Sequence, residues 1–214
     1  MLPVRDFRPT RIFPVVTYTI IGVNIIVFIG EFLLDGMGYL DWFYYEFAVI
    51  PASIMEGERL YTLFTSMFMH SGVFHILFNM LYLYIFGNNI EDSMGSGRFL
   101  IFYFLCGLIA TGAHIYTDPQ SQIPTLGASG AIAGVLGSYM VLFPRERVDA
   151  LLGYIYIRVP AIVVLLSWFI LQLFSGILSL GQMGEGGIAF FAHIGGFIAG
   201  AILIFIFRKR QRDQ

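Results

Sequence analysis

The chain has 214 residues, of which 57% are hydrophobic and only 12% are charged, with a formal net charge of −2 and a mean hydropathy of +0.78. This balance excludes a water-soluble globular protein, because a soluble fold needs a mostly polar outer layer. The length suits about six or seven membrane-spanning helices of roughly 20 residues, without a large additional soluble domain. The single cysteine, Cys106, excludes a disulfide framework.

Six apolar segments follow one another along the chain. They lie at about 14–33, 73–90, 98–116, 127–143, 159–180 and 188–207. A backbone in hydrocarbon must satisfy its own hydrogen bonds, so apolar runs of this length predict helices. The sequence therefore predicts an all-α polytopic membrane protein, in which residues 1–214 form one domain, a bundle of six transmembrane helices.

Basic residues predict how these spans are oriented. With the N-terminus in the cytoplasm, eleven of the twelve Lys and Arg residues fall on the cytoplasmic side, and only Arg59 lies outside. This asymmetry follows the positive-inside rule. The first apolar segment lacks the small-residue cleavage pattern of a signal peptide, so it is predicted to be a membrane span that is not removed. We therefore expect an integral protein of a prokaryotic plasma membrane, with cytoplasmic termini and short basic tails at about 1–13 and 208–214.

Two external connections stand out by composition. The first, at about 34–72, is long and contains aromatic clusters such as 41–45. Aromatic side chains suit a membrane interface, so this loop is predicted to be half-embedded. The connection at 181–187 has four glycines in seven residues, which suits either a flexible cap or an ordinary connector.

Four polar residues lie near the outer ends of three spans. His75 and Asn79, four residues apart and hence on one helical face, begin the second span, whereas Ser129 begins the fourth and His193 the sixth. The even-numbered spans run from outside to inside in the predicted orientation. At about 1.5 Å per residue, all four side chains share one shallow layer below the outer surface.

This set of side chains suits acyl transfer. A serine hydroxyl becomes an effective nucleophile when a neighbouring base takes its proton, so Ser129 is the candidate nucleophile and His193 the candidate general base. The candidate donors to the oxyanion are the His75 imidazole, the Asn79 amide and the backbone N–H at Ser129. With no carboxylate placed to orient His193, we expect a Ser-His dyad.

The motifs around these residues resemble those of the rhomboid intramembrane serine proteases. They are Gly127-Ala128-Ser129-Gly130 for the nucleophile, His75-x-x-x-Asn79, Gly87-x-x-x-Glu91-x-x-x-Gly95, and the run 192–200 with His193, Gly196 and Gly200. The resemblance covers residues from about 60 to 200, in the same order and on the expected spans.

The resemblance implies both an activity and structural roles. The activity is cleavage of peptide bonds in or next to transmembrane segments of other proteins, in the lipid bilayer, without a cofactor, a metal or nucleic acid. Gly127 and Gly130 belong to the nucleophile motif, Gly196 and Gly200 would let spans four and six touch, and Glu91 would tie the second span to its neighbour.

Two departures from the family pattern concern the site and the first loop. Where many members have Trp-Arg, this chain has Tyr61-Thr62, with Arg59 nearby but shifted. Where the family often has an aromatic residue that stacks on the base, this chain has Ala133. The sequence leaves open what holds the His193 ring.

The same residues bear on other functions of a membrane protein. A catalytically inactive rhomboid-like protein that binds membrane clients is the main alternative. An ion-coupled transporter needs charged groups near the bilayer midplane, whereas the acidic residues here lie in loops or at span ends. A zinc protease needs His-Glu-x-x-His, and none of the four histidines is followed by glutamate.

Overall fold

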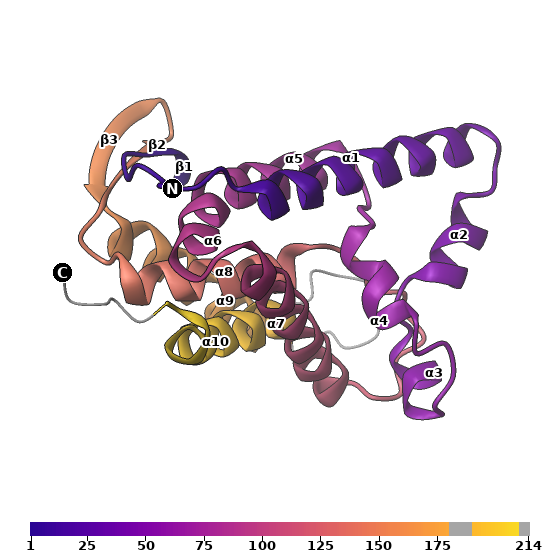
Figure 1. The fold of residues 1–214 in the computed structure, drawn as a ribbon. Helices are drawn as coiled ribbons and strands as arrows, with labels where there is room; N and C mark the ends of the chain where they lie inside the picture. The colour runs from indigo at the N-terminus through magenta and orange to yellow at the C-terminus, as the bar shows by residue number, and fades with distance from the viewer. Residues whose placement is uncertain (180–189, 210–214) are drawn as a thin grey trace.

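The computed structural model describes residues 1–179 and 190–209 (Figure 1). In this part of the chain, five helical segments are long and apolar enough to cross a membrane: α1 (Val15–Gly36), the segment Val73–Met94, α7 (Ser96–Thr117), α9 (Ala161–Ser179) and α10 (Phe190–Phe207). A shorter apolar helix is α8 (Ser129–Leu142). The predicted helical membrane bundle is thus confirmed. The predicted glycine-rich connection at 181–187 lies outside the described residues.

The second span is one continuous helix with a wider turn in its middle. It consists of α5 (Val73–Tyr82), the π-helical turn η2 (Leu83–Gly87) and α6 (Asn88–Met94). In α6, the buried Glu91 carboxylate accepts hydrogen bonds from the backbone N–H groups of Val16 and Thr17, at 3.0 and 2.8 Å. These groups have no partner within their own helix, so Glu91 caps α1 and ties it to the second span.

The central helix of the bundle, α8, is short. Ten of its 14 residues, at 130–139, are buried. At 1.5 Å per residue the helix is about 21 Å long, less than the ~30 Å of a hydrocarbon core. Its ends therefore cannot both reach the membrane surface. Ser129 is the first residue of α8, and its depth in the bilayer stays a prediction.

The backbones of α8 and α10 touch. A Cβ atom on Gly200 would lie 1.9 Å from the Gly134 carbonyl oxygen, and one on Gly196 would lie 2.1 Å from the Gly130 carbonyl oxygen. Only glycine fits at such distances, and small residues at four-residue spacing are the usual means of close helix approach in lipid. This contact holds the first turns of the two helices together.

The first long connection folds into short helices. These are α2 (Leu40–Phe47), α3 (Pro51–Met55), α4 (Thr62–Thr65) and the 3₁₀ turn η1 (Ser66–Phe68). Its half-embedded position stays a prediction.

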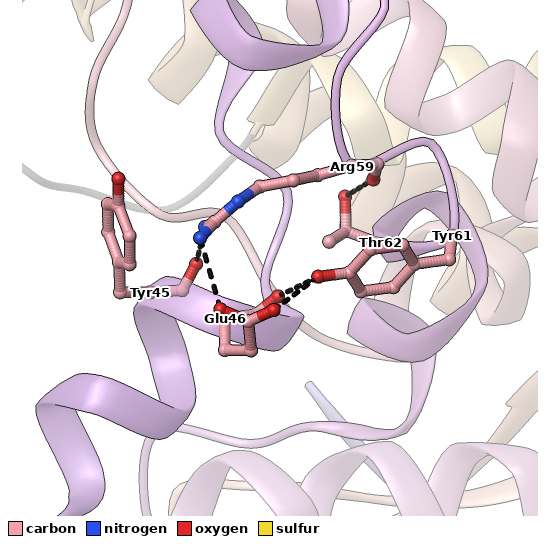
Figure 2. Close-up of polar contacts among 5 residues, drawn as sticks. All are labelled: Tyr45, Glu46, Arg59, Tyr61 and Thr62. Atoms are coloured by element: carbon pink, nitrogen blue, oxygen red, sulfur yellow. Dashed lines mark hydrogen bonds and ion pairs between the residues drawn. The ribbon is translucent and has the colours of Figure 1, made fainter.

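Polar contacts close this loop on itself (Figure 2). The Arg59 guanidinium donates to the Tyr45 backbone carbonyl and, at 3.1 Å, to the Glu46 carboxylate, whose other oxygen accepts from the Tyr61 hydroxyl at 2.6 Å. Arg59 has a φ of 51°, in the left-handed region that residues other than glycine seldom adopt. We call Arg59, Glu46 and Tyr61 the loop clasp.

A small antiparallel sheet lies across the end of the bundle where α1 begins (Figure 1). Its strands, in order, are β1 (Leu2–Asp6), β2 (Arg147–Leu152) and β3 (Ile155–Pro160). Residues 2–6 lie in the predicted N-terminal tail, and the sheet was not predicted, since each strand is short and β1 pairs with a segment far along the chain. Asp6 attaches the sheet to the bundle by accepting a hydrogen bond from Tyr139 of α8, at 3.0 Å.

Candidate functional site

Ser129 lies at the N-terminus of α8, where a constrained glycine precedes it. Gly127 has a φ of +131°, and its backbone N–H donates to the Ser66 carbonyl at 2.9 Å. A Cβ atom on Gly127 would come within 3.0 Å of His75 Nε2 and 3.6 Å of Ser129 Oγ. Glycine is therefore required here both by the backbone conformation and by the space between His75 and Ser129.

His193, in the first turn of α10, meets this serine. Its Nε2 lies 2.7 Å from Ser129 Oγ, and the side chain is only 8% exposed. The contact between α8 and α10 at Gly130 and Gly196 lies directly beside the pair. Two residues that are far apart in the sequence are thus brought into hydrogen-bonding contact.

Two residues of α9 hold the His193 ring, and neither contact was predicted from the sequence. Gln172 Oε1 lies 3.0 Å from His193 Nδ1, and the Trp168 ring lies beside the imidazole with centroids 5.8 Å apart. Their four-residue spacing puts them on one helical face, but it does not reveal that this face meets α10. An aromatic ring does lie beside the imidazole, but it belongs to Trp168 of α9 and not to the residue at position 133 of α8, which is alanine.

The Gln172 contact indicates which nitrogen of His193 carries the proton. An amide oxygen only accepts, so Nδ1 must donate to it. In a neutral imidazole the other nitrogen then has a free lone pair, and this nitrogen, Nε2, faces Ser129 Oγ. The ring is therefore in the tautomer that can accept the serine proton.

His75 lies beside the same serine, but the ring nitrogen that it turns toward the site is a hydrogen-bond donor. The backbone N–H of Ser71 donates to His75 Nδ1 at 3.3 Å, and the Ser71 hydroxyl lies 3.1 Å from the same nitrogen. Since a backbone N–H only donates, Nδ1 is an acceptor and the neutral ring carries its proton on Nε2. That N–H is on the side of the ring near Gly127 and Ser129.

Asn79 stays a predicted oxyanion donor, because its amide carries two N–H groups and one of them has a partner in its own helix. Its amide nitrogen donates to the backbone carbonyl of His75, one turn earlier in the same helix, at 2.9 Å. The side chain is buried, and within residues 1–179 and 190–209 its hydrogen bond is to its own helix rather than to Ser129. The structure thus brings together Ser129, His193 and His75, and Asn79 lies one turn after His75 in the same helix.

A small cavity of about 30 Å³ opens beside Ser129. Its polar lining includes Ser66, Thr111 and Thr125. A space of this size holds one or two water molecules where polar partners are present. This cavity could not be predicted from the sequence, because its lining comes from five separate segments.

The chain is similar to members of one family over most of its length. The family model of the Rhomboid domain matches residues 57–210. YdcA of Bacillus subtilis (strain 168) is 30% identical over 162 residues, which cover 74% of this chain and 73% of that protein. The rhomboid protease GluP of the same organism is 32% identical over 136 residues, 63% of this chain and 26% of GluP.

The rhomboid protease GlpG of Salmonella paratyphi A is 26% identical over 199 residues, 93% of this chain and 65% of GlpG. The chain therefore spans less than two thirds of the length of GluP and of GlpG.

Proposed function

Since this chain belongs to the rhomboid family and is an integral membrane protein, we propose that it is a serine endopeptidase that cleaves transmembrane segments of other membrane proteins near the outer face of the bilayer. The observation that carries the proposal is the 2.7 Å contact between Ser129 Oγ and His193 Nε2 at the start of a short central helix. A serine with a correctly protonated histidine in contact has the two groups that acyl transfer requires.

The first half of the reaction uses this pair directly. Ser129 Oγ attacks the carbonyl carbon of the substrate peptide bond, and its proton passes to His193 Nε2. The oxyanion that forms accepts hydrogen bonds from His75 Nε2–H and from backbone N–H groups at the start of α8, where the helix dipole also favours negative charge. His193 then gives its proton to the leaving amine, and the C–N bond breaks.

The second half needs water at a depth where lipid would exclude it. The cavity beside Ser129 is placed to hold that water, next to the acyl carbon. The water attacks the ester as its proton passes to His193, and that proton returns to Ser129 Oγ when the acyl group leaves. The cycle restores both residues, with no cofactor consumed.

Gln172 orients the base in this scheme. Its amide oxygen keeps the proton of His193 on Nδ1 through both steps, in the place that a carboxylate occupies in a Ser-His-Asp triad. The amide adds no charge, which suits a site inside a membrane, where a charged side chain is costly.

Cleavage of a single-span substrate in liposomes tests the proposal. The intact protein should release product, and Ser129→Ala should abolish release without loss of folded protein. A matched control is Ser167→Ala in α9, since that hydroxyl donates to the Val164 carbonyl of its own helix, at 2.9 Å. This variant should keep its activity.

The same assay separates protease from client-binding protein. Product from Ser129→Ala at the rate of the intact chain would remove Ser129 from the mechanism. Binding of several single-span substrates without cleavage by any folded form of the chain would instead favour the client-binding alternative.

A further inference from the structure

The sheet that lies across the bundle has two chemically different faces. One face meets the helices: Val148 and Ala150 on β2 are fully buried, and their register partners on β3 are Val159 and Ile157. Because successive strand residues alternate between faces, Leu152 and its partner Ile155 belong to this same face. The face is therefore apolar from one end of the hairpin to the other.

The end of this hairpin projects past the helices that cover its base. Leu152 is 52% exposed and Ile155 is 65% exposed, whereas Val148 and Ala150 are 0% exposed. The two-residue turn between them begins with Gly153 at a φ of +61° and places Tyr154 at the end, fully exposed. We call Leu152, Tyr154, Ile155 and Tyr156 the hairpin tip.

The opposite face of the sheet is polar at its base. Arg147, Asp149 and Arg158 lie on it by alternation, and Arg158 forms an ion pair with Asp149 at 2.7 Å. One face of the sheet therefore continues into exposed aliphatic side chains, whereas the other face carries charges. Such a sheet suits a position between an apolar environment and water.

The apolar environment is identified by the helix that follows. β3 ends at Pro160 and α9 begins at Ala161 without a connecting loop. The first turns of α9, a membrane span, expose Ile162, Val163 and Leu166. The exposed apolar surface of the span is thus linked directly to the hairpin, and what surrounds the span is lipid.

We infer that the hairpin tip is a membrane-binding surface, which inserts into the interface of the leaflet next to the start of α9. Leu152 and Ile155, on the face turned toward the bundle, contact the acyl chains. Tyr154 and Tyr156 lie at headgroup level, where an aromatic ring is buried while its hydroxyl stays hydrated. The sheet then rests on the bilayer as well as on the helices.

Fluorescence quenching in liposomes tests this inference on the full chain. A polarity-sensitive dye is attached through Tyr154→Cys or Ile155→Cys, and the matched control carries it at Arg147→Cys on the opposite face. The native chain is the unlabelled reference, because Cys106 is 0% exposed. The label at either tip position should be quenched several-fold more by nitroxide lipids than the control label, and less by iodide in the water.

Two results would overturn the inference. The first is quenching of the tip labels by iodide as efficient as that of the Arg147→Cys label, which would place the tip in water. The second is tip fluorescence that depends on the ratio of protein to lipid rather than on nitroxide, which would indicate contact with a second copy of the chain. All three substitutions are at exposed positions, so the bundle should fold in each variant.

Discussion

At the scale of single residues, the reactivity of Ser129 depends on the nitrogen of His193 that faces it. Gln172 binds the other nitrogen at 3.0 Å, and Trp168 lies beside the ring. A carboxylate in the same place would also stabilise the imidazolium ion, but it would have to be desolvated within the membrane. The Gln172 amide orients the imidazole without the free-energy cost of desolvating a charge.

Removal of the Gln172 acceptor should therefore slow the chemistry and leave substrate binding intact. In Gln172→Leu we expect kcat to fall by about 10-fold or more with KM little changed, because a misoriented base acts in the transition state and not in binding. The rate at which a fluorophosphonate labels Ser129 should fall in parallel. This second readout reports the nucleophile without the substrate.

Gln172→Glu is the matched control, since it keeps an oxygen acceptor of the same length. Its labelling rate should recover most of what the leucine variant loses. If the leucine variant reacts with the fluorophosphonate as fast as the native chain, Gln172 is a packing residue.

The sequence predicted part of this site. Motifs and span depth led to the expectation that Ser129 and His193 lie together, and the structure places their side chains 2.7 Å apart; their catalytic roles remain proposals. The partners of His193 on α9 could not be predicted, because the rotation of one helix against another depends on packing along its whole length. The hydrogen bond from Asn79 to its own helix could not be predicted either. The four-residue spacing predicts that His75 and Asn79 share a helical face, but it does not predict the rotamer of the Asn79 side chain.

At the scale of helices and loops, the contact between α8 and α10 permits no side chain. In Gly200→Ala the new methyl group would meet the Gly134 carbonyl, so the helices must separate or tilt. We expect a loss of about 1–3 kcal/mol in the free energy of unfolding, measured by unfolding in mixed micelles, together with a loss of activity.

Gly22→Ala provides the control for this substitution. Gly22 lies in α1, another membrane span, and nothing is within 4 Å of the place where its methyl group would be. Its free energy of unfolding should stay the same or rise slightly, because alanine is the better helix former. Equal destabilisation by both substitutions would mean that the packing of α8 on α10 is not the cause.

The loop clasp makes a comparable prediction for the first connection. Arg59→Ala removes the contacts to Tyr45 and Glu46 and keeps the unfavourable positive φ, whereas Arg59→Gly removes the contacts but relieves the backbone. Both variants should show faster hydrogen exchange across α2 and α4, with the glycine variant less affected. Unchanged exchange in both would show that aromatic packing alone holds the loop.

The helices could be predicted from long apolar runs, whereas the sheet could not. A span is a local property, because lipid requires each segment to satisfy its own backbone. The pairing of β1 with β2 is non-local, and Leu2–Asp6 has no pattern that distinguishes it from a basic tail.

At the scale of the whole molecule, the bundle surrounds a central helix that is too short to cross the membrane. A helix of this length leaves non-helical backbone at one or both ends within the membrane, and such backbone requires protein around it. The backbone bridge between Val49 and Thr125 provides part of that support. Span order predicts the depth of the site, and that depth stays a prediction, whereas the cavity beside Ser129 could be found only from the assembled fold.

The glycine contact between α8 and α10 has a consequence for how the protein responds to its surroundings. Ser129 and His193 sit on two helices that touch at the level of the main chain, so the distance between them does not vary with bilayer thickness or with tilt of the outer helices. The intrinsic reactivity of the serine should then be the same in thin and thick bilayers. A change of lipid would alter turnover only through the entry of the substrate.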